Sequence, residues 1–379
     1  MKEKMMEFGK SLKSDLCAIS DFMYHNPELG NKEYKASEKL VTYLKEKGFT
    51  VTYPFLGIET AFEAVYDSGK PGESIAFLCE YDALPEIGHG CAHNMIGAIG
   101  AGAGVILSEI MSGKNGDMGG KVYVYGTPAE ETNGGKVAMS EKGVFKNITA
   151  AMMMHPSGFT RESGKSAAME AVQFRYKGKT AHAAGCPELG INALNSVIQL
   201  FNGIDALRQH VKPDVRIHGV ISKGGVAANI VPDEAIAQFY IRSATKEYLA
   251  EVKEKVLKIA EGAALMTGAT LEVSNYELSY DDLKTNQPLS EAFNKNIRDL
   301  GIKEIKPALT GAGSSDIGNV SNVVPTIHPY LGITDKDVTG HSVEFAAATL
   351  TELAHERLLI GALALAYTGY DVMNGDVKL

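Results

Sequence analysis

Five segments of the chain concentrate side chains that can bind a metal ion, take up a proton or contact a substrate. They are residues 80–94, 127–135, 155–156, 313–316 and 339–342. The first three come directly after apolar runs that are typical of buried strands. Their thiol, imidazole and carboxylate groups are the ligands that Zn²⁺ and other transition ions prefer. This joint placement favours a metal site.

Two of these segments hold pairs of polar residues close together. Cys91 and His93 are two residues apart and can point into one site, and Glu130 and Glu131 stand side by side in a turn. Neighbouring carboxylates repel each other unless a cation accompanies them. If one binds the ion, the other can take a proton from metal-bound water, whose pKa falls to about 7. Each pair alone is also explained by a buried cysteine beside a hydrogen-bonded histidine, or by a solvated acidic pair.

The elements that must position these residues are predicted by the apolar pattern. Short buried strands are expected over residues 74–79, 121–126 and 151–155, with His155 at the end of the last one. Helices are expected over residues 36–47 and 95–111. Strands separated by helices indicate an α/β sheet covered by helices, and such sheets place ligands at the carboxyl ends of their strands.

The pattern changes after about Gly164. Over residues 166–279 the expected order is strand, helix, strand, strand, helix, strand, which is typical of a ferredoxin-like α+β unit. The remainder returns to helices and strands and ends in a helix expected over residues 346–367. We therefore predict a discontinuous catalytic domain over residues 1–165 and 280–379, with a domain inserted between its parts.

Composition limits the possible partners. The 379 residues carry 46 acidic and 37 basic side chains, a net charge of −9. This argues against a general affinity for nucleic acid or for an anionic membrane, since both require a basic face. The amino-terminal residues lack the apolar core of a signal peptide, and the longest weakly polar run, residues 95–107, is too short to span a bilayer. We expect a cytoplasmic protein with reduced cysteines.

A set of motifs spread over nearly the whole chain resembles a known family. They are Cys91-Ala92-His93-Asn94, Glu80-Tyr81-Asp82-Ala83-Leu84-Pro85, Pro128-Ala129-Glu130-Glu131, His155, Lys179-Thr180-Ala181-His182, Asn229-Ile230-Val231-Pro232-Asp233, Arg242, Ser314-Ser315-Asp316 and His341. The family is that of the aminoacylase and glutamate-carboxypeptidase-like zinc peptidases. Within it, the chain is most similar to the amidohydrolase branch, which includes hippurate, auxin-conjugate and especially aminobenzoyl-glutamate hydrolases.

The resemblance implies a fold, a cofactor and a site. The fold would be an α/β catalytic domain with a helix-flanked mixed sheet and an inserted ferredoxin-like lid that forms a homodimer. The cofactor would be two divalent ions (Zn, Mn, Co or Ni). Their implied ligands are Cys91, which would bridge them, His93, Glu131, His155 and His341.

The implied roles of the other site residues concern proton transfer and substrate binding. Glu130 would be the general base, and His182 would reach the oxyanion from the lid of the partner protomer. Asn229 and Arg242 would hold the substrate carboxylate. The backbone of Gly311–Ser314, including Gly313 and Ser314, would line the substrate pocket.

The implied reaction is hydrolysis of an amide bond in an N-acyl amino acid, an aryl-amide conjugate or a small dipeptide with a free carboxylate. Two positions depart from the motif, because Ala92 replaces a glycine and Asn94 an aspartate. Two alternatives remain. One is a non-catalytic relative that binds a small ligand, against which Glu130 at the base position argues. The other is a hydrolase with Cys91 as nucleophile, although a base only two residues away is awkwardly placed.

Overall fold

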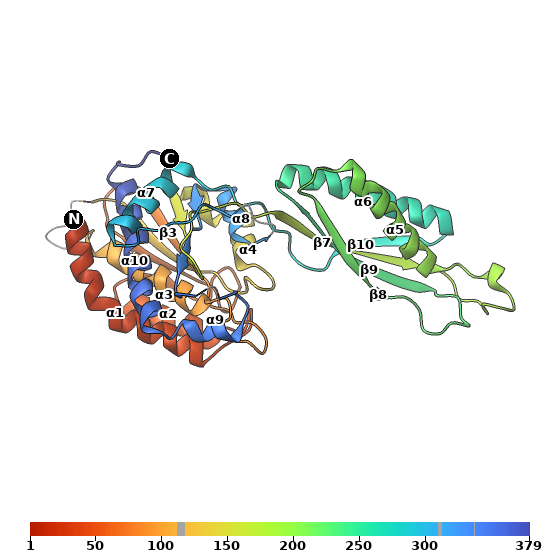
Figure 1. The fold of residues 1–379 in the computed structure, drawn as a ribbon, viewed down its shortest axis with the longest axis horizontal. Helices are drawn as coiled ribbons and strands as arrows, with labels where there is room; N and C mark the ends of the chain where they lie inside the picture. Colours follow the sequence, from red (N-terminus) through yellow and green to blue (C-terminus); the bar gives the residue numbers. More distant parts are fainter. Residues whose placement is uncertain (112–117, 310–312, 337) are drawn as a thin grey trace. The chain divides into compact units, whose positions relative to one another are not determined.

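The structure is a computed structural model that describes residues 1–111, 118–309, 313–336 and 338–379 (Figure 1). The chain forms two compact units. The larger consists of Met1–Lys165, Leu283–Gly311 and Ser315–Leu379, and the smaller of Ser166–Asp282 with Ala312–Ser314. In the described part of the chain, every helix is too short or too polar to cross a membrane.

The larger unit is built on a six-stranded mixed sheet in the order β1-β2-β4-β3-β5-β11. The strands are β1 (Thr50–Thr52), β2 (Phe62–Asp67), β3 (Ser74–Cys79), β4 (Lys121–Gly126), β5 (Ala150–Met152) and β11 (Thr326–Ile327). β3 runs parallel to β4 and β5, and β5 runs parallel to β11, whereas β2 is antiparallel to its neighbours. The predicted α/β class with a mixed sheet is therefore confirmed.

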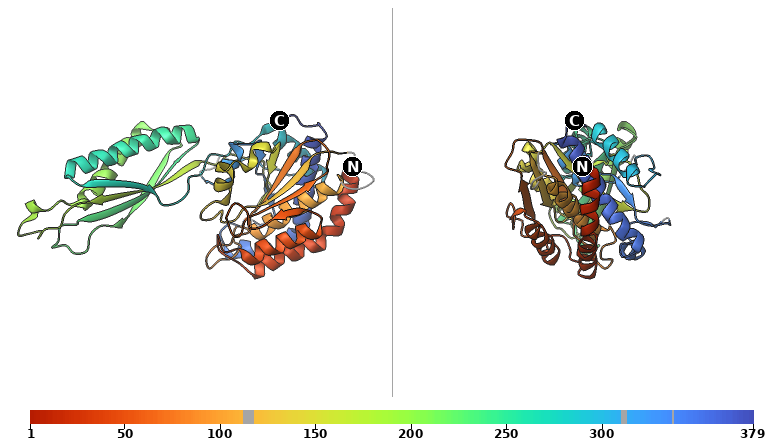
Figure 2. Two further views of the ribbon diagram at one scale, coloured as in Figure 1. Left: turned by 180° about the vertical axis from the view of Figure 1, so that it is seen from behind. Right: turned by 90° about the vertical axis from the view of Figure 1, so that its left-hand side faces the viewer.

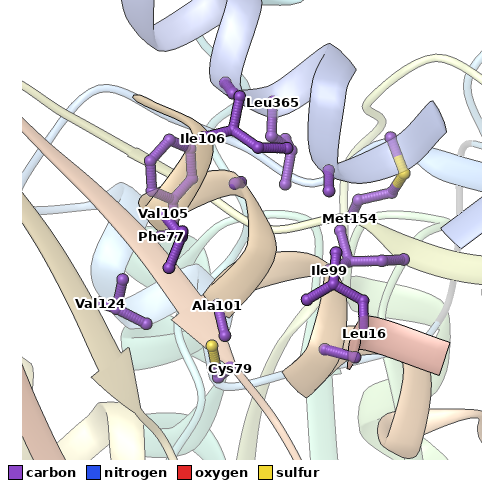
Figure 3. Packing of buried hydrophobic residues seen from close by; sticks show 14 of the residues in the cluster. Leu16, Phe77, Cys79, Ile99, Ala101, Val105, Ile106, Val124, Met154 and Leu365 are labelled. Atoms are coloured by element: carbon purple, nitrogen blue, oxygen red, sulfur yellow. The ribbon is translucent and has the colours of Figure 1, made fainter. Parts of the chain in front are cut away.

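Alternating side chains of this sheet fill a separate apolar core on each face. In β3, Ile75, Phe77 and Cys79 belong to one core, and Ala76 and Leu78 to the other. The helices of the larger unit surround the sheet (Figure 2). They are α1 (Lys2–His25), α2 (Tyr34–Glu46), α3 (His93–Glu109), α4 (Gly135–Glu141), α7 (Gln287–Asp299), α8 (Ile317–Ser321), α9 (Val343–Ala348) and α10 (Glu352–Met373). Figure 3 shows α3 and α10 packing in the larger of the two cores.

Two glycines let α3 lie directly on the sheet. A Cβ atom at Gly100 would come within 2.8 Å of the Leu78 carbonyl oxygen, and one at Gly104 within 2.3 Å of a Val124 methyl group. Any side chain there would push the helix away from β3 and β4. Because α3 begins at His93, this close packing also fixes the position of the His93 side chain relative to the strand ends.

The smaller unit is an antiparallel four-stranded sheet in the order β10-β7-β9-β8, with two helices packed against it. Its elements are β7 (Ala168–Lys177), α5 (Ala193–Leu207), β8 (Arg216–Lys223), β9 (Glu234–Ser243), α6 (Lys246–Thr267) and β10 (Thr270–Asn275). In β9 every second residue is buried, because one face of the sheet packs against the two helices. This confirms the predicted ferredoxin-like insert.

Two sequence-based predictions were wrong in detail. Residues 151–155 do not form one strand, because β5 ends at Met152 and His155 instead opens β6 (His155–Ser157), which pairs with β12 (Tyr330–Gly332). The carboxyl-terminal helix expected over residues 346–367 is divided into α9 and α10, because the hydroxyl of Thr351 caps a new helix at the amide of Ala354. A continuous apolar run does not show where a strand changes partners.

Candidate metal centre

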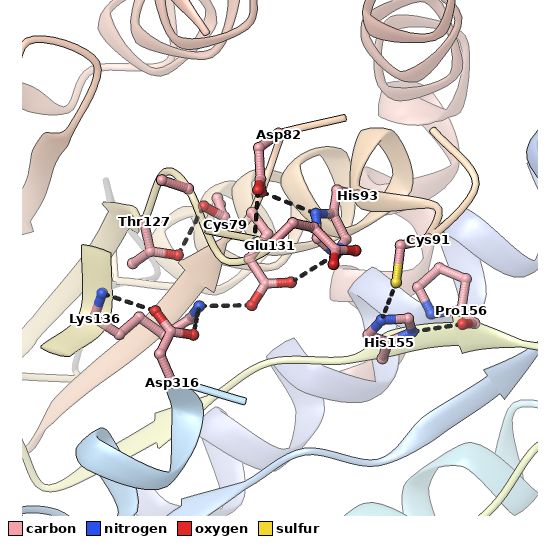
Figure 4. Close-up of polar contacts among 12 residues, drawn as sticks. Cys79, Asp82, Cys91, His93, Thr127, Glu131, Lys136, His155, Pro156 and Asp316 are labelled. Atoms are coloured by element: carbon pink, nitrogen blue, oxygen red, sulfur yellow. Dashed lines mark hydrogen bonds and ion pairs between the residues drawn. The ribbon is translucent and has the colours of Figure 1, made fainter. Parts of the chain in front are cut away.

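Cys91 and His93 are brought to the strand ends by the turn that opens α3. Ala92 between them adopts a left-handed conformation with φ 59°, so the two side chains converge. The Cys91 Sγ lies 3.4 Å from the His155 Nε2. The other ring nitrogen of His155 lies 2.6 Å from the Pro156 carbonyl oxygen, to which it must donate. The lone pair of the His155 Nε2 therefore faces Cys91 (Figure 4).

Glu131 reaches the same place from the turn after β4. Its Oε1 lies 3.9 Å from the Nε2 of His93 and 3.4 Å from the Nε2 of His341. His341 comes from the carboxyl-terminal part of the chain, and its amide donates to the Gly90 carbonyl oxygen at 2.8 Å. The structure therefore brings together all five residues implied as metal ligands, from four separate segments.

The donor atoms fit a pair of ions. Among the described residues, four sets have their donor atoms within 4.8 Å of one another: Cys91 with His93 and His155, Cys91 with Glu131 and His341, His93 with Glu130 and Glu131, and Glu80 with Glu130 and Asp316. Cys91 belongs to the first two sets, so its thiolate could contribute to either of them. Within the described residues, the buried His93 Nε2 and Glu131 Oε1 make no hydrogen bond, although the first lies 3.4 Å from a Glu80 oxygen and the second 3.4 Å from the His341 Nε2. Buried polar atoms without a hydrogen bond are costly unless a ligand such as a cation binds them.

Burial sets the protonation of the sulfur and of the neighbouring imidazole. It raises the pKa of the Cys91 thiol to about 12, so that the thiol stays protonated in neutral solution until a cation binds. It lowers the pKa of His155 to about 4, with a further contribution from His93, and keeps that imidazole neutral. A protonated thiol is a poor nucleophile, which argues against the cysteine-nucleophile alternative, whereas a neutral imidazole is ready to bind metal.

Asp82 orients two of the candidate ligands, and the sequence analysis gave it no role. One carboxylate oxygen lies 2.9 Å from the His93 Nδ1, and the other accepts a hydrogen bond from the Glu131 amide at 3.0 Å. Carboxylates in this position hold a ligating imidazole in one tautomer and one orientation. The signal available in the sequence was an acidic residue in the loop that leads to His93.

A buried cluster of charges joins Glu80 and Asp316, which stand in the quoted motifs, to Lys136, which no motif includes. The Lys136 ammonium lies 2.6 Å from a carboxylate oxygen of Glu80 and 2.6 Å from one of Asp316. The other oxygen of Glu80 lies 3.4 Å from the His93 Nε2. Although burial opposes ionisation, the ammonium of Lys136 and the nearby His93 lower the pKa of Glu80 to about 2. Nothing in the local pattern around Lys136 distinguishes it from a surface lysine of a helix.

His328 is a fourth histidine at this site, beside the three that are candidate ligands. It is 4% exposed, and its ring centroid lies 5.6 Å from that of His155 and 5.4 Å from that of Tyr330. Among the described residues, its Nε2 has no hydrogen-bond partner.

The remaining predicted site residues lie in the smaller unit. The Nδ1 of His182 accepts hydrogen bonds from the amides of Ala184 and Gly185, so its Nε2 carries the proton and is available as a donor. The segment of His182 pairs with that of Asn229, whose carbonyl oxygen accepts from the Ala183 amide at 3.0 Å.

Arg242 and Ser314 are also brought together in the smaller unit. The Arg242 Nη1 donates to the Ser314 hydroxyl at 3.3 Å. Gly313, which directly precedes Ser314, is exposed. Gly311 and Ala312 lie outside the described residues. The arrangement places a guanidinium beside a hydroxyl, a combination suited to binding a carboxylate.

Comparison with known proteins gives relatives of both units. A family model described as a peptidase dimerisation domain matches residues 158–266. The Xaa-Arg dipeptidase of Mus musculus is 35% identical over 369 residues, which cover 94% of this chain and 85% of that protein. One of the subunits of the p-aminobenzoyl-glutamate hydrolase of Escherichia coli (strain K12) is 33% identical over 305 residues, covering 76% of this chain and 62% of that protein. A dinuclear metal-binding peptidase of the M20 family from Bacillus subtilis has the same fold, with a TM-score of 0.67 at 20% identity, covering 96% and 99% of the two chains.

Proposed function

The chain belongs to the M20 peptidase family of metallohydrolases that act on amide and peptide bonds, and from this premise we propose that it cleaves a small amide carrying a free carboxylate. The substrate would be an N-acyl amino acid, an aryl-amide conjugate or a dipeptide. The observation that carries this proposal is the convergence of thiol, imidazole and carboxylate donors around Cys91, with Glu130 beside them.

Five residues are proposed to hold two divalent ions. They are Cys91, His93, Glu131, His155 and His341. When bound, the ions polarise the substrate carbonyl and lower the pKa of water so that it can attack at neutral pH. Asp82 keeps the Nε2 of His93 turned towards the site, since it holds the opposite ring nitrogen.

Glu130 is proposed to move the proton during hydrolysis. It takes a proton from the attacking water as the new C–O bond forms, and returns it to the amine nitrogen as the C–N bond breaks. His182 would stabilise the developing oxyanion through its Nε2–H, which its own local hydrogen bonds leave free to donate. The products are a carboxylic acid and an amine.

Removal of the metal tests this function directly. We expect a chelator to reduce hydrolysis of N-acyl amino acids, aminobenzoyl-glutamate and dipeptides to background, and Zn²⁺, Mn²⁺, Co²⁺ or Ni²⁺ to restore it. The measurement is the rate of amine release after dialysis, with bound metal quantified in the same samples. A hydrolase with Cys91 as nucleophile would instead keep its activity after the metal is removed. Full activity in the metal-free protein would overturn the proposal.

The substrate carboxylate is proposed to bind Arg242 and Asn229. A guanidinium can hold a carboxylate through two parallel hydrogen bonds, and it supplies local attraction that the net charge of −9 does not. We expect Arg242→Met to raise KM for a substrate with a free carboxylate by about 10-fold or more, the order of one charge-assisted hydrogen bond. The same substrate with its carboxylate converted to an amide is the control, and its hydrolysis should change little. Equal effects on both substrates would place the carboxylate elsewhere.

A homodimer is proposed to form through the smaller unit, which matches a peptidase dimerisation domain. The edge strand β8 of its sheet is exposed over most of its length and includes Val220 and Ile221. An exposed apolar edge strand is a surface that a second copy can cover. Light scattering at micromolar concentration should give about twice the 40.6 kDa of one chain.

A further inference from the structure

The turn that carries Glu130 donates backbone hydrogen bonds, on both sides of this residue, to carboxylates from other parts of the larger unit. On one side the Glu131 amide donates to Asp82, and on the other the Ala129 amide donates to an oxygen of Glu33 at 2.8 Å. Ala129 has a left-handed φ of 64°, which a non-glycine residue adopts only when its surroundings impose it. The backbone on both sides of the general base is thus held from outside the turn.

Glu33 is placed for this contact by its own neighbours. It lies immediately before α2, is completely buried, and its second oxygen accepts from the Thr60 hydroxyl at 2.8 Å. The adjacent Gly30 packs against the turn, because a Cβ atom there would come within 3.0 Å of the Ala129 Cα. A carboxyl with no exposed surface is costly to keep, and burial together with the nearby Asp82 raises its pKa to about 7.

The segment that contains Glu33 is itself attached to the other turn of the site. The Ala83 amide donates to the Glu28 carbonyl oxygen at 2.8 Å, next to Asp82. At the start of α2, the Glu28 carboxylate accepts from the amides of Lys35 and Ala36. Residues 28–33 therefore contact both the loop after β3 and the turn after β4.

We propose that Glu33 is a positioning residue for Glu130, holding the Ala129 peptide so that the general base is aimed at the attacking water. The proposal rests on the proposed hydrolytic function. Glu33 itself is assigned no contact with substrate or metal, and it acts only through the hydrogen bond to the Ala129 amide. Displacements of about 1 Å can cost on the order of 100-fold in rate, so the contribution of such a contact is measurable.

The test compares variants that keep or lose this hydrogen bond. Glu33→Gln retains an acceptor oxygen for Ala129 and can donate to Thr60, so we expect its kcat to stay within about fivefold of the wild type. Glu33→Leu fills the space but leaves the amide unpaired, and we expect kcat to fall by at least about 10-fold with KM and bound metal unchanged. Thr60→Val removes only the hydroxyl that contacts the second oxygen of Glu33 and leaves the hydrogen bond to Ala129 in place, so its kcat should fall less than that of Glu33→Leu.

Hydrogen exchange of the metal-free protein provides a readout that does not depend on catalysis. The peptide covering residues 127–134 should exchange faster in Glu33→Leu than in Glu33→Gln or Thr60→Val. If Glu33→Leu does not fold, Glu33→Asp replaces it, because the shorter side chain cannot span to Ala129. Wild-type kcat and exchange in either variant would overturn the positioning role. A wild-type protein without metal-dependent hydrolysis would instead overturn the proposed function, so the two failures are distinguishable.

Discussion

Glu130→Gln is expected to lower kcat by about 100- to 10,000-fold, the usual contribution of a general base, while the protein still binds its metal. The substitution preserves the size and most of the hydrogen-bonding shape of the side chain but removes its ability to take a proton. Burial and the carboxylates of Glu80 and Asp316 raise the pKa of Glu130 well above its usual range in the metal-free protein. A carboxylate with increased proton affinity is suited to accepting a proton and returning it.

The measurement is kcat and KM with metal content determined on the same preparation. Glu131 remains in place, so the amount of bound metal should not change. Glu141→Gln makes the same chemical change at an exposed position of α4 and should leave turnover unaffected. A loss smaller than about 10-fold in Glu130→Gln would mean that another group moves the proton.

Lys136→Met is expected to destabilise the protein by about 3–5 kcal/mol, the range observed when one partner of a buried ion pair is removed. The ammonium of Lys136 has no exposed surface and is the shared ion-pair partner of Glu80 and Asp316, which are themselves buried. Methionine matches the volume of the side chain, so the loss would come from carboxylates left without a cation rather than from a cavity. Urea unfolding of the metal-free protein, followed by circular dichroism, measures this change.

Two controls separate electrostatics from packing in this experiment. Lys295→Met removes a surface partner of Asp299, in a pair whose side chains are 72% and 58% exposed, and should change stability by no more than about 1 kcal/mol. The triple variant Lys136→Met, Glu80→Gln, Asp316→Asn removes the unpaired charges and should recover much of the stability lost by the single variant. If Lys136→Met were no more harmful than Lys295→Met, the cluster would not be a determinant of stability.

The sequence alone determined the architecture and indicated the candidate metal ligands. β3 and β4 have the predicted bounds because their apolar runs are short, continuous and ended by polar turns, which is a local signal. The ferredoxin-like insert follows from element order and from the alternation of buried residues in β9. The five candidate ligands were implied by the resemblance of motifs spread along the chain to those of a known family.

Only the tertiary structure decided how these residues are supported. Asp82, Glu33 and Lys136 act on partners as far as 180 residues away, as in the hydrogen bond between Lys136 and Asp316. The strand that begins at His155 likewise depends on its pairing with Tyr330. Hydrophobic periodicity reports which face of an element is buried, but it contains no information about which distant segment covers that face. Long-range hydrogen bonds and buried ion pairs arise only when the elements pack, so the physics that orients the catalytic groups cannot be read from any local stretch of the chain.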